Sequence, residues 1–184
     1  ILNKYKYREQ IGYMPQIGRY PDYMTVGQII EMIKKVRNSD AVLDEDLIKA
    51  FELEKIFDKQ MRTLSGGTTQ KVSAILAFLF NPDVLILDEP TAGLDPLASE
   101  ILKEKIIKER EKGKLILITS HLLSELDDMI SQIIFMQEGK VLLHGTSDFV
   151  IHSPELKSAF ENRINVYTLD SGRPVIIAKK DLTN

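Results

Sequence analysis

A chain of 184 residues is long enough to form one domain with a hydrophobic core. Its formal net charge of −3 argues against a general nucleic-acid binder, because such proteins usually carry an excess of basic residues. The absence of cysteine excludes disulfides and thiolate metal sites and is compatible with a reducing cytoplasm. No apolar stretch approaches the ~20 residues of a membrane span, so we expect any membrane association to come through a partner.

The first third of the chain is predicted to contain a short strand, a loop and helices. Residues 11–16 have the form of a strand ending in a loop that holds Gln16, and a Pro-Gln loop need have no role of its own. Thr25 and Gln28 fit a capping box at the start of a helix whose apolar stripe extends over residues 26–36. Residues 44–57 carry a second apolar pattern, from which we expect one helix and a turn.

The sequence Leu64-Ser65-Gly66-Gly67, here called the signature loop, precedes an apolar run over residues 72–80. Serine is a good N-cap, and glycine lets backbone N–H groups approach a ligand closely. A helix N-terminus with such N–H groups binds anions, so the signature loop is a candidate anion site. The alternative is an ordinary serine cap on a core helix.

The central stretch runs from Val84 to Asp95 and joins four apolar residues directly to two acids. A short continuous apolar run predicts a strand buried on both faces, as in parallel sheets. Asp88 and Glu89 then lie at the carboxyl end of that strand, where open α/β sheets bind ligands. Asp88 can hold Mg²⁺, and Glu89 can orient or deprotonate an attacking water. The alternative is a surface turn that carries two acids.

A helix and a second strand are predicted next. Pro96 is expected to begin a helix that runs to about Lys112, with its Lys and Glu residues facing water. The apolar residues expected to face the sheet are Leu97, Ile101, Ile106 and Ile107. Residues 115–119 predict a second buried strand, and Ser120-His121 follows at its carboxyl end. A lone histidine is usually a core or surface residue.

The C-terminal third is predicted to contain small elements without chemistry of their own. We expect a short helix over residues 122–129, a β-hairpin around Glu138-Gly139 and another around residues 170–172. His144 has no metal-ligand spacing around it, so we treat it as an ordinary residue.

Four of these sequences, in this order and spacing, resemble the ATPase subunit of ABC (ATP-binding cassette) transporters: the signature loop, VLILDEP at 84–90, GLD at 93–95 and Ser120-His121. The resemblance covers about residues 8 to 145. It implies an α/β fold with a P-loop NTPase-like (RecA-like) parallel sheet and an inserted helical subdomain. The implied division is a catalytic core at 1–16 and 81–145, the helical subdomain at 17–80 and a C-terminal tail at 146–184.

The resemblance also implies roles for particular residues. Gln16 would meet the Mg²⁺ and the attacking water, and His121 would contact the γ-phosphate. Asp88 would hold the metal, and Glu89 would be the catalytic base. The nucleotide would contact Ser65, Gly66, Gly67 and Asp95. The implied cofactors are ATP and Mg²⁺. The implied partners are a transmembrane permease and a second ATPase subunit in a homodimer, with the protein peripheral on the cytoplasmic face of the membrane.

The chain departs from the family pattern in three places. Thr68 stands where glutamine is common and Leu76 where many members carry arginine, which indicates a subgroup of exporter-like or accessory-type ATPases. The phosphate-binding sequence G-x-x-x-x-G-K-[ST] is absent, and in the family it precedes the segment of Gln16. We therefore expect this chain, which begins with Ile rather than Met, to lack the N-terminal strands and phosphate loop and to be inactive alone.

The expected absence of the phosphate-loop strand leads to a prediction about the edge of the sheet. In related ATPases the strand before His121 lies between the phosphate-loop strand and the strand of Asp88. Without the phosphate-loop strand, the edge of residues 115–119 would be bare, and bare apolar edges pair with other chains. We therefore expect self-association, or covering of this edge by the N- or C-terminal segment.

Finer and competing interpretations stay open. Residues 71–82 look similar to the accessory ATPases of nitrous-oxide reductase maturation, which are tied to copper-site assembly. A soluble ABC-type ATPase that acts on ribosomes or DNA is an alternative, although neither tandem cassettes nor a long coiled coil is visible. A third possibility, for this piece alone, is a non-catalytic interaction module.

Overall fold

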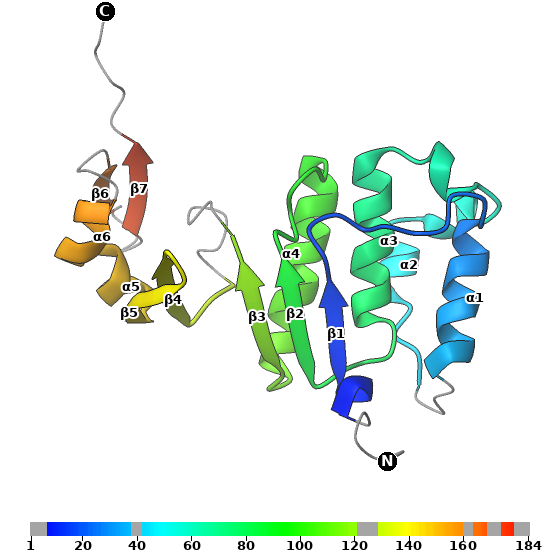
Figure 1. The fold of residues 1–184 in the computed structure, drawn as a ribbon, viewed down its shortest axis with the longest axis horizontal. Helices are drawn as coiled ribbons and strands as arrows, with labels where there is room; N and C mark the ends of the chain where they lie inside the picture. Colours follow the sequence, from blue (N-terminus) through cyan, green and yellow to red (C-terminus); the bar gives the residue numbers. More distant parts are fainter. Residues whose placement is uncertain (1–6, 38–41, 121–128, 160–163, 169–173, 179–184) are drawn as a thin grey trace, which may run out of the picture. The chain divides into compact units, whose positions relative to one another are not determined.

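Two compact units make up the computed structural model: residues 1–121 and residues 122–184 (Figure 1). The structure describes residues 7–37, 42–120, 129–159, 164–168 and 174–178. The helix predicted over residues 122–129 therefore lies almost wholly outside the described residues. None of the helices in these ranges has the length and apolar character needed to span a bilayer.

A three-stranded parallel sheet organises the first unit. Its strands are β1 (Ile11–Met14), β2 (Val84–Asp88) and β3 (Leu115–Thr119), and they lie side by side in that order (Figure 1). The register pairs Asp88, the last residue of β2, with Thr119, the last residue of β3. The three predicted strands are therefore confirmed, and because they are parallel their carboxyl ends share one edge of the sheet.

One face of the sheet packs against helix α3 (Gly66–Phe78). A Cβ on Gly12 of β1 would lie 2.1 Å from the carbonyl oxygen of Ala77, so only glycine permits this approach of strand and helix. Leu85 and Leu87 of β2 are fully buried on the same face. This packing fixes where the carboxyl end of β2 lies relative to the start of α3.

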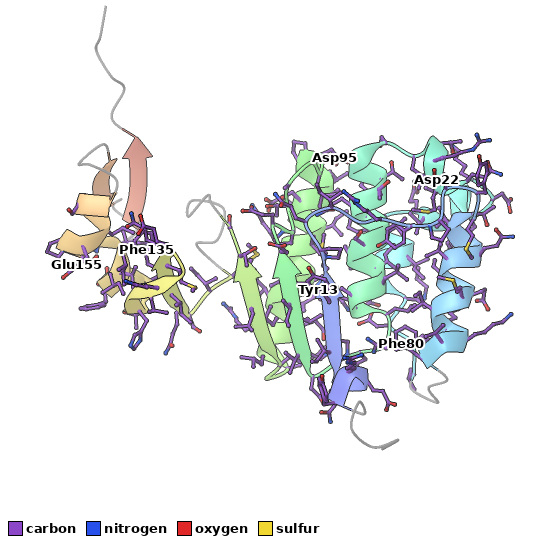
Figure 2. The ribbon with its side chains drawn as sticks, in the orientation of Figure 1. Tyr13, Asp22, Phe80, Asp95, Phe135 and Glu155 are labelled. Carbon is purple, nitrogen blue, oxygen red and sulfur yellow. The ribbon has the colours of Figure 1, made fainter. Side chains whose placement is uncertain are left out.

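The second face of the sheet is less covered. Tyr13 and Leu117 are about half exposed, and Val84 and Ile86 of β2 are only partly buried (Figure 2). The prediction that β2 is buried on both faces is therefore wrong for the described part of the chain. The prediction of a second buried strand at residues 115–119 is wrong as well, because every residue of β3 is exposed or partly exposed at this edge of the sheet. In β2, alternate residues are buried on the face that α3 covers, while the residues between them remain partly open.

Strand β3 is an edge strand of this sheet. Among the described residues no strand pairs with its outer side. Edge strands present N–H and C=O groups that pair readily with other chains. This edge is therefore a candidate for self-association.

Helix α1 (Val26–Arg37) begins with the predicted capping box. The N–H of Gln28 donates to Oγ1 of Thr25 over 3.2 Å, and the N–H of Thr25 donates to Oε1 of Gln28 over 2.9 Å. The buried residues of its apolar stripe are Val26, Ile29 and Ile30.

Residues 44–57 form the one helix and turn that the pattern predicts, and a 3-10 helix follows the turn. A short helix α2 (Asp46–Ala50) is followed by a 3-10 helix, η2 (Leu53–Ile56), and a second one, η3 (Met61–Thr63), precedes the signature loop. Between α2 and η2, Glu52 has a φ of 51°, in the left-handed region that ends a helix. The apolar residues Leu47, Ile48 and Leu53 are nevertheless buried.

Helix α4 (Pro96–Glu111) begins at Pro96, as predicted, and Gly113 follows its end with a φ of 84°. Its buried apolar residues are Ala98, Leu102 and Ile106. Leu97 is 72% exposed, so the prediction that it faces the sheet is wrong. The packed stripe starts one residue further along the helix, at Ala98.

The prediction that the lysines and glutamates of α4 face water is wrong for Lys105 and Glu109, whose side chains are 5% and 0% exposed. Their Nζ and Oε1 atoms lie 3.1 Å apart, and each has further partners of opposite charge, which makes their burial tolerable. The Nζ atom of Lys105 lies 2.5 Å from Oδ2 of Asp44, which precedes α2. We call this group the ionic cluster; its members are Asp44, Asp46, Lys105, Glu109, Lys112 and Lys114.

In the second unit, β4 (Gln132–Gln137) and β5 (Lys140–Thr146) form the first predicted hairpin. Its turn residues Glu138 and Gly139 have φ angles of 50° and 74°, as a two-residue hairpin turn of type I′ requires. Helix α5 (Ser147–Ile151) follows the hairpin. A small core joins these elements through Ile133, Val150 and Ile151.

The remaining elements of the second unit are helix α6 (Pro154–Ala159) and a second hairpin of β6 (Ile164–Thr168) and β7 (Pro174–Ala178). This hairpin is also predicted by the sequence. None of the residues singled out for chemistry falls in these elements.

Candidate functional site

The carboxyl ends of the parallel strands bring predicted site residues to one edge of the sheet (Figure 1). Asp88 ends β2 and Glu89 follows it, and both are partly buried. Gln16 lies two residues beyond the end of β1 and is exposed. His121 lies outside the described residues, one position after Ser120. Three of these four predicted residues therefore share one edge of the sheet.

Thr119, the last residue of β3, contacts both acids. Its hydroxyl donates a hydrogen bond to Oδ1 of Asp88. The N–H of Glu89 donates to the Thr119 hydroxyl over 3.2 Å and to the Thr119 carbonyl over 3.1 Å. Glu89 itself has a φ of 47°, a left-handed conformation that non-glycine residues rarely adopt. The β2–β3 pairing thus continues one residue past the ladder and turns the chain sharply at Glu89.

The carbonyl of Glu89 is held as well. The side chain of Gln70, which is 5% exposed, donates to this carbonyl over 3.4 Å, and the N–H of Ala92 donates to it over 3.1 Å. Gln70 belongs to α3, so the helix that follows the signature loop directly supports the backbone of Glu89. Backbone strain of this kind persists where neighbouring groups hold it in place, and such strain concentrates at functional sites.

The signature loop packs against the turn that follows the acids. Ser65 caps α3 as predicted, and its Oγ accepts a hydrogen bond from the N–H of Thr68 over 3.2 Å. A Cβ on Gly67 would lie 2.6 Å from the carbonyl oxygen of Gly93, whereas a Cβ on Gly66 would meet nothing within 4 Å. Gly93 has a φ of 75°, so both partners of this close contact need to be glycine.

Asp95, which is labelled in Figure 2, serves as the N-cap of α4, and it also pairs with a lysine of α3. Its Oδ1 accepts from the N–H of Ala98 over 2.8 Å, and its Oδ2 lies 2.8 Å from Nζ of Lys71. The hydrogen bond from Lys71, followed by that from Ala98, lowers the pKa of Asp95. In this structure Asp95 therefore joins the starts of α3 and α4.

The segment after Gln16 is fixed to the same helix. The hydroxyl of Tyr20 lies 2.8 Å from Oγ of Ser73 on α3, and burial raises the pKa of Tyr20. A Cβ on Gly18 would lie 2.3 Å from the same Oγ, so the chain passes close to the helix there. This segment borders a hollow of about 340 Å³ lined by Gly18, Arg19, Tyr20, Asp22, Met61 and Thr69.

The oxygen-rich edge fits a magnesium ion that arrives with a phosphate ligand. No group of three or more His, Cys, Asp or Glu side chains in the described ranges has the arrangement of a metal site. Mg²⁺, however, is commonly held by one or two carboxylates together with waters and substrate phosphates. The carboxylate of Asp88, with the amide oxygen of Gln16 at the same edge, is a donor set of that kind.

Sequence reasoning missed three residues that support the site: Gln70, Lys71 and Thr119. Gln70 and Lys71 lie in the first two turns of α3, and the sequence pattern predicts that polar residues there are exposed to solvent. Thr119 is the polar last residue of an otherwise apolar strand. This polarity was the signal in the sequence that could have indicated a contact with other polar groups. Its contact with Asp88 depends on the β2–β3 register, which the sequence does not specify.

Comparison with known protein families places these features in context. The family model described as "ABC transporter" matches residues 2–92. The human phospholipid-transporting ATPase ABCA3 is 34% identical over 139 residues, which is 73% of this chain and 8% of that protein. An uncharacterized ABC transporter ATP-binding protein of Bacillus subtilis is 32% identical over 145 residues, which is 77% of this chain and 49% of that protein. The chain thus spans half or less of the length of these relatives.

A solved structure described as the ATP-binding subunit of an ABC transporter superposes with a TM-score of 0.72 and 28% identity. The superposition covers 86% of this chain and 65% of that chain. The fold of this chain is therefore that of ABC ATPase domains, a P-loop NTPase fold, and its sequence relates it to ABC transporter ATP-binding proteins.

Proposed function

We propose that this chain belongs to an ATP-hydrolysing subunit that powers an ABC transporter. The observation that carries the proposal is the arrangement of Asp88 and Glu89 at the carboxyl edge of a parallel sheet. One acid is hydrogen-bonded through its carboxylate, and the other is held in a left-handed backbone conformation. The names of the relatives, including the phospholipid-transporting ATPase ABCA3, support transport as the process that is driven.

The proposed chemistry divides the work between the two acids. Asp88 and Gln16 would hold Mg²⁺, directly or through water, and the ion when bound would supply positive charge next to the transferred phosphoryl group. Glu89 accepts a proton from, or orients, the water that attacks the γ-phosphate. His121, which follows Ser120 in the sequence, is proposed to contact the γ-phosphate.

The signature loop is proposed to contact ATP held by a second subunit. Ser65 and Gly66 are exposed at the start of α3, where backbone N–H groups favour an anion. Gly67 and Asp95 contribute by packing the loop against the turn after the acids. Two copies would then enclose two nucleotides, each between one copy's phosphate-binding loop and the other copy's signature loop.

The transmembrane partner is proposed to dock on the helical region of residues 17–80, which places the protein peripherally on the cytoplasmic face of the membrane. Ile17 and Tyr23, beside the hollow at residues 18–22, are 69% and 74% exposed, which supports an apolar contact there. The finer assignment to copper-linked accessory ATPases rests on the likeness of residues 71–82, and identification of the permease partner tests it.

Nucleotide assays on the full-length protein to which these residues belong test the proposed function. Glu89→Gln should retain ATP binding and lose turnover by about 10²–10⁴-fold, because only the proton-accepting group is removed. Asp88→Asn should weaken both Mg²⁺-dependent ATP binding and turnover. Glu104→Gln, on the exposed face of α4, is the matched control and should behave as wild type. Wild-type turnover in Glu89→Gln would contradict the proposal.

A further inference from the structure

The Thr119 hydroxyl makes hydrogen bonds that are not needed to form the β-strand. It lies between the carboxylate of Asp88, to which it donates, and the N–H of Glu89, from which it accepts. A hydroxyl has one proton and two lone pairs, so these two bonds use its donor and one acceptor position. The same oxygen thereby connects the two acids, which are neighbours in sequence but differ in proposed role.

The ladder between β2 and β3 explains why Thr119 makes this contact. Asp88 and Thr119 form the last pair of the parallel register, so their side chains project from the same face at the carboxyl edge. Glu89 then leaves the strand with a φ of 47° and turns its N–H back toward Thr119.

We propose that Thr119 is a positioning residue for ATP hydrolysis, an inference that rests on the proposed function. Its hydroxyl fixes the orientation of the Asp88 carboxylate by engaging Oδ1, so that the carboxylate would be held ready for a bound cation. It also stabilises the left-handed turn that aims the side chain of Glu89. Thr119 touches neither nucleotide nor attacking water; it acts through the two acids.

A valine at this position removes the hydroxyl and keeps the shape and the β-branched character that suit a strand. Loss of a group that orients a metal ligand typically lowers metal affinity or activity by about 10–100-fold. In the full-length protein, Thr119→Val should therefore lower kcat by about tenfold or more and leave the KM for ATP within about twofold. Thr119→Ser, which restores the hydroxyl, should recover most of the lost rate.

A binding measurement separates positioning from general damage. Electron paramagnetic resonance of Mn²⁺ with a non-hydrolysable ATP analogue should show about tenfold weaker Mn²⁺ binding in Thr119→Val and near-normal binding in Thr119→Ser. Binding of the analogue without metal should be unchanged in both variants. Circular dichroism should give both variants the wild-type unfolding midpoint within a few degrees.

The outcomes distinguish this inference from the proposed function. If Glu89→Gln abolishes turnover while Thr119→Val keeps wild-type kcat and Mn²⁺ binding, the function stands and the role of Thr119 is wrong. If Thr119→Ser is as impaired as Thr119→Val, the hydroxyl is not the active group and the inference is also wrong. If Glu89→Gln changes nothing, the proposed function fails, and the positioning role of Thr119 fails with it.

Discussion

The ionic cluster allows a stability effect to be calculated for one residue, Glu109. Burial raises the pKa of Glu109, but hydrogen bonds from Lys112, Lys114 and Lys105 outweigh it and lower the pKa from its ordinary value of 4.5 to about 2. At about 1.36 kcal/mol per pKa unit, this difference corresponds to about 3 kcal/mol of folding stability at pH 7. Glu109→Gln should therefore destabilise the first unit by about that amount.

The loss of stability in Glu109→Gln should depend on pH, whereas a loss caused by packing alone would not. Because the folded pKa of Glu109 lies below the unfolded one, its ionised form stabilises the fold above about pH 4.5. This stabilisation is lost as the pH falls from about 4.5 through about 2. The difference in unfolding free energy between wild type and Glu109→Gln should therefore shrink by roughly half between pH 7 and pH 3.

Urea unfolding followed by circular dichroism, at pH 7 and again at pH 3, measures this difference. Glu104→Gln is the matched control, because Glu104 lies on the same helix, is 69% exposed and is 3.8 Å from Lys108. Exposed pairs of this kind contribute less than about 1 kcal/mol. A loss for Glu109→Gln no larger than that for Glu104→Gln, or one that is equal at both pH values, would refute the electrostatic reasoning.

Two further predictions concern packing and the sheet edge. Gly67→Ala should lower stability by about 1–3 kcal/mol, because its Cβ would lie 2.6 Å from the backbone oxygen of Gly93. Gly66→Ala, with open space around it, should not, and equal thermal unfolding midpoints for the two variants would contradict the predicted contact. The 184-residue chain should self-associate through β3, and Leu117→Lys should reduce this in sedimentation velocity because an edge charge opposes strand pairing. A wild-type chain that is monomeric at all concentrations would count against it.

Local rules predicted much of the fold of the first unit. The capping box at Thr25 and Gln28, the Ser65 cap and Pro96 at the start of α4 each depend on residues within one helical turn. The hairpin at Glu138-Gly139 follows in the same way from two turn residues. Features whose cause lies within a few residues could therefore be read from the sequence.

The errors arose where distant residues decide the outcome. In the sequence, Lys105 and Glu109 resemble residues of a solvated helix face. In the fold, Lys105 pairs with Asp44, which lies 61 residues earlier in the chain. Thr119 gains its importance from the register of β2 against β3, which no local pattern encodes.

The candidate site also combines residues whose positions could be predicted from the sequence with residues whose contacts could not. The acids Asp88 and Glu89 follow a recognisable apolar run, so their position at the carboxyl edge was predictable. The groups that hold them, Gln70 and Thr119, come from an adjacent helix and strand and needed the tertiary arrangement.

Size-exclusion chromatography of full-length Glu89→Gln with ATP and Mg²⁺ tests the central claim most directly. Without its base the protein should bind ATP, fail to hydrolyse it and elute as a dimer held together by trapped nucleotide. Adding Ser65→Arg should return it to a monomer, because the longer side chain occupies the anion position at the start of α3. A monomer with bound ATP in Glu89→Gln, or a dimer that Ser65→Arg leaves intact, would contradict the proposed mechanism.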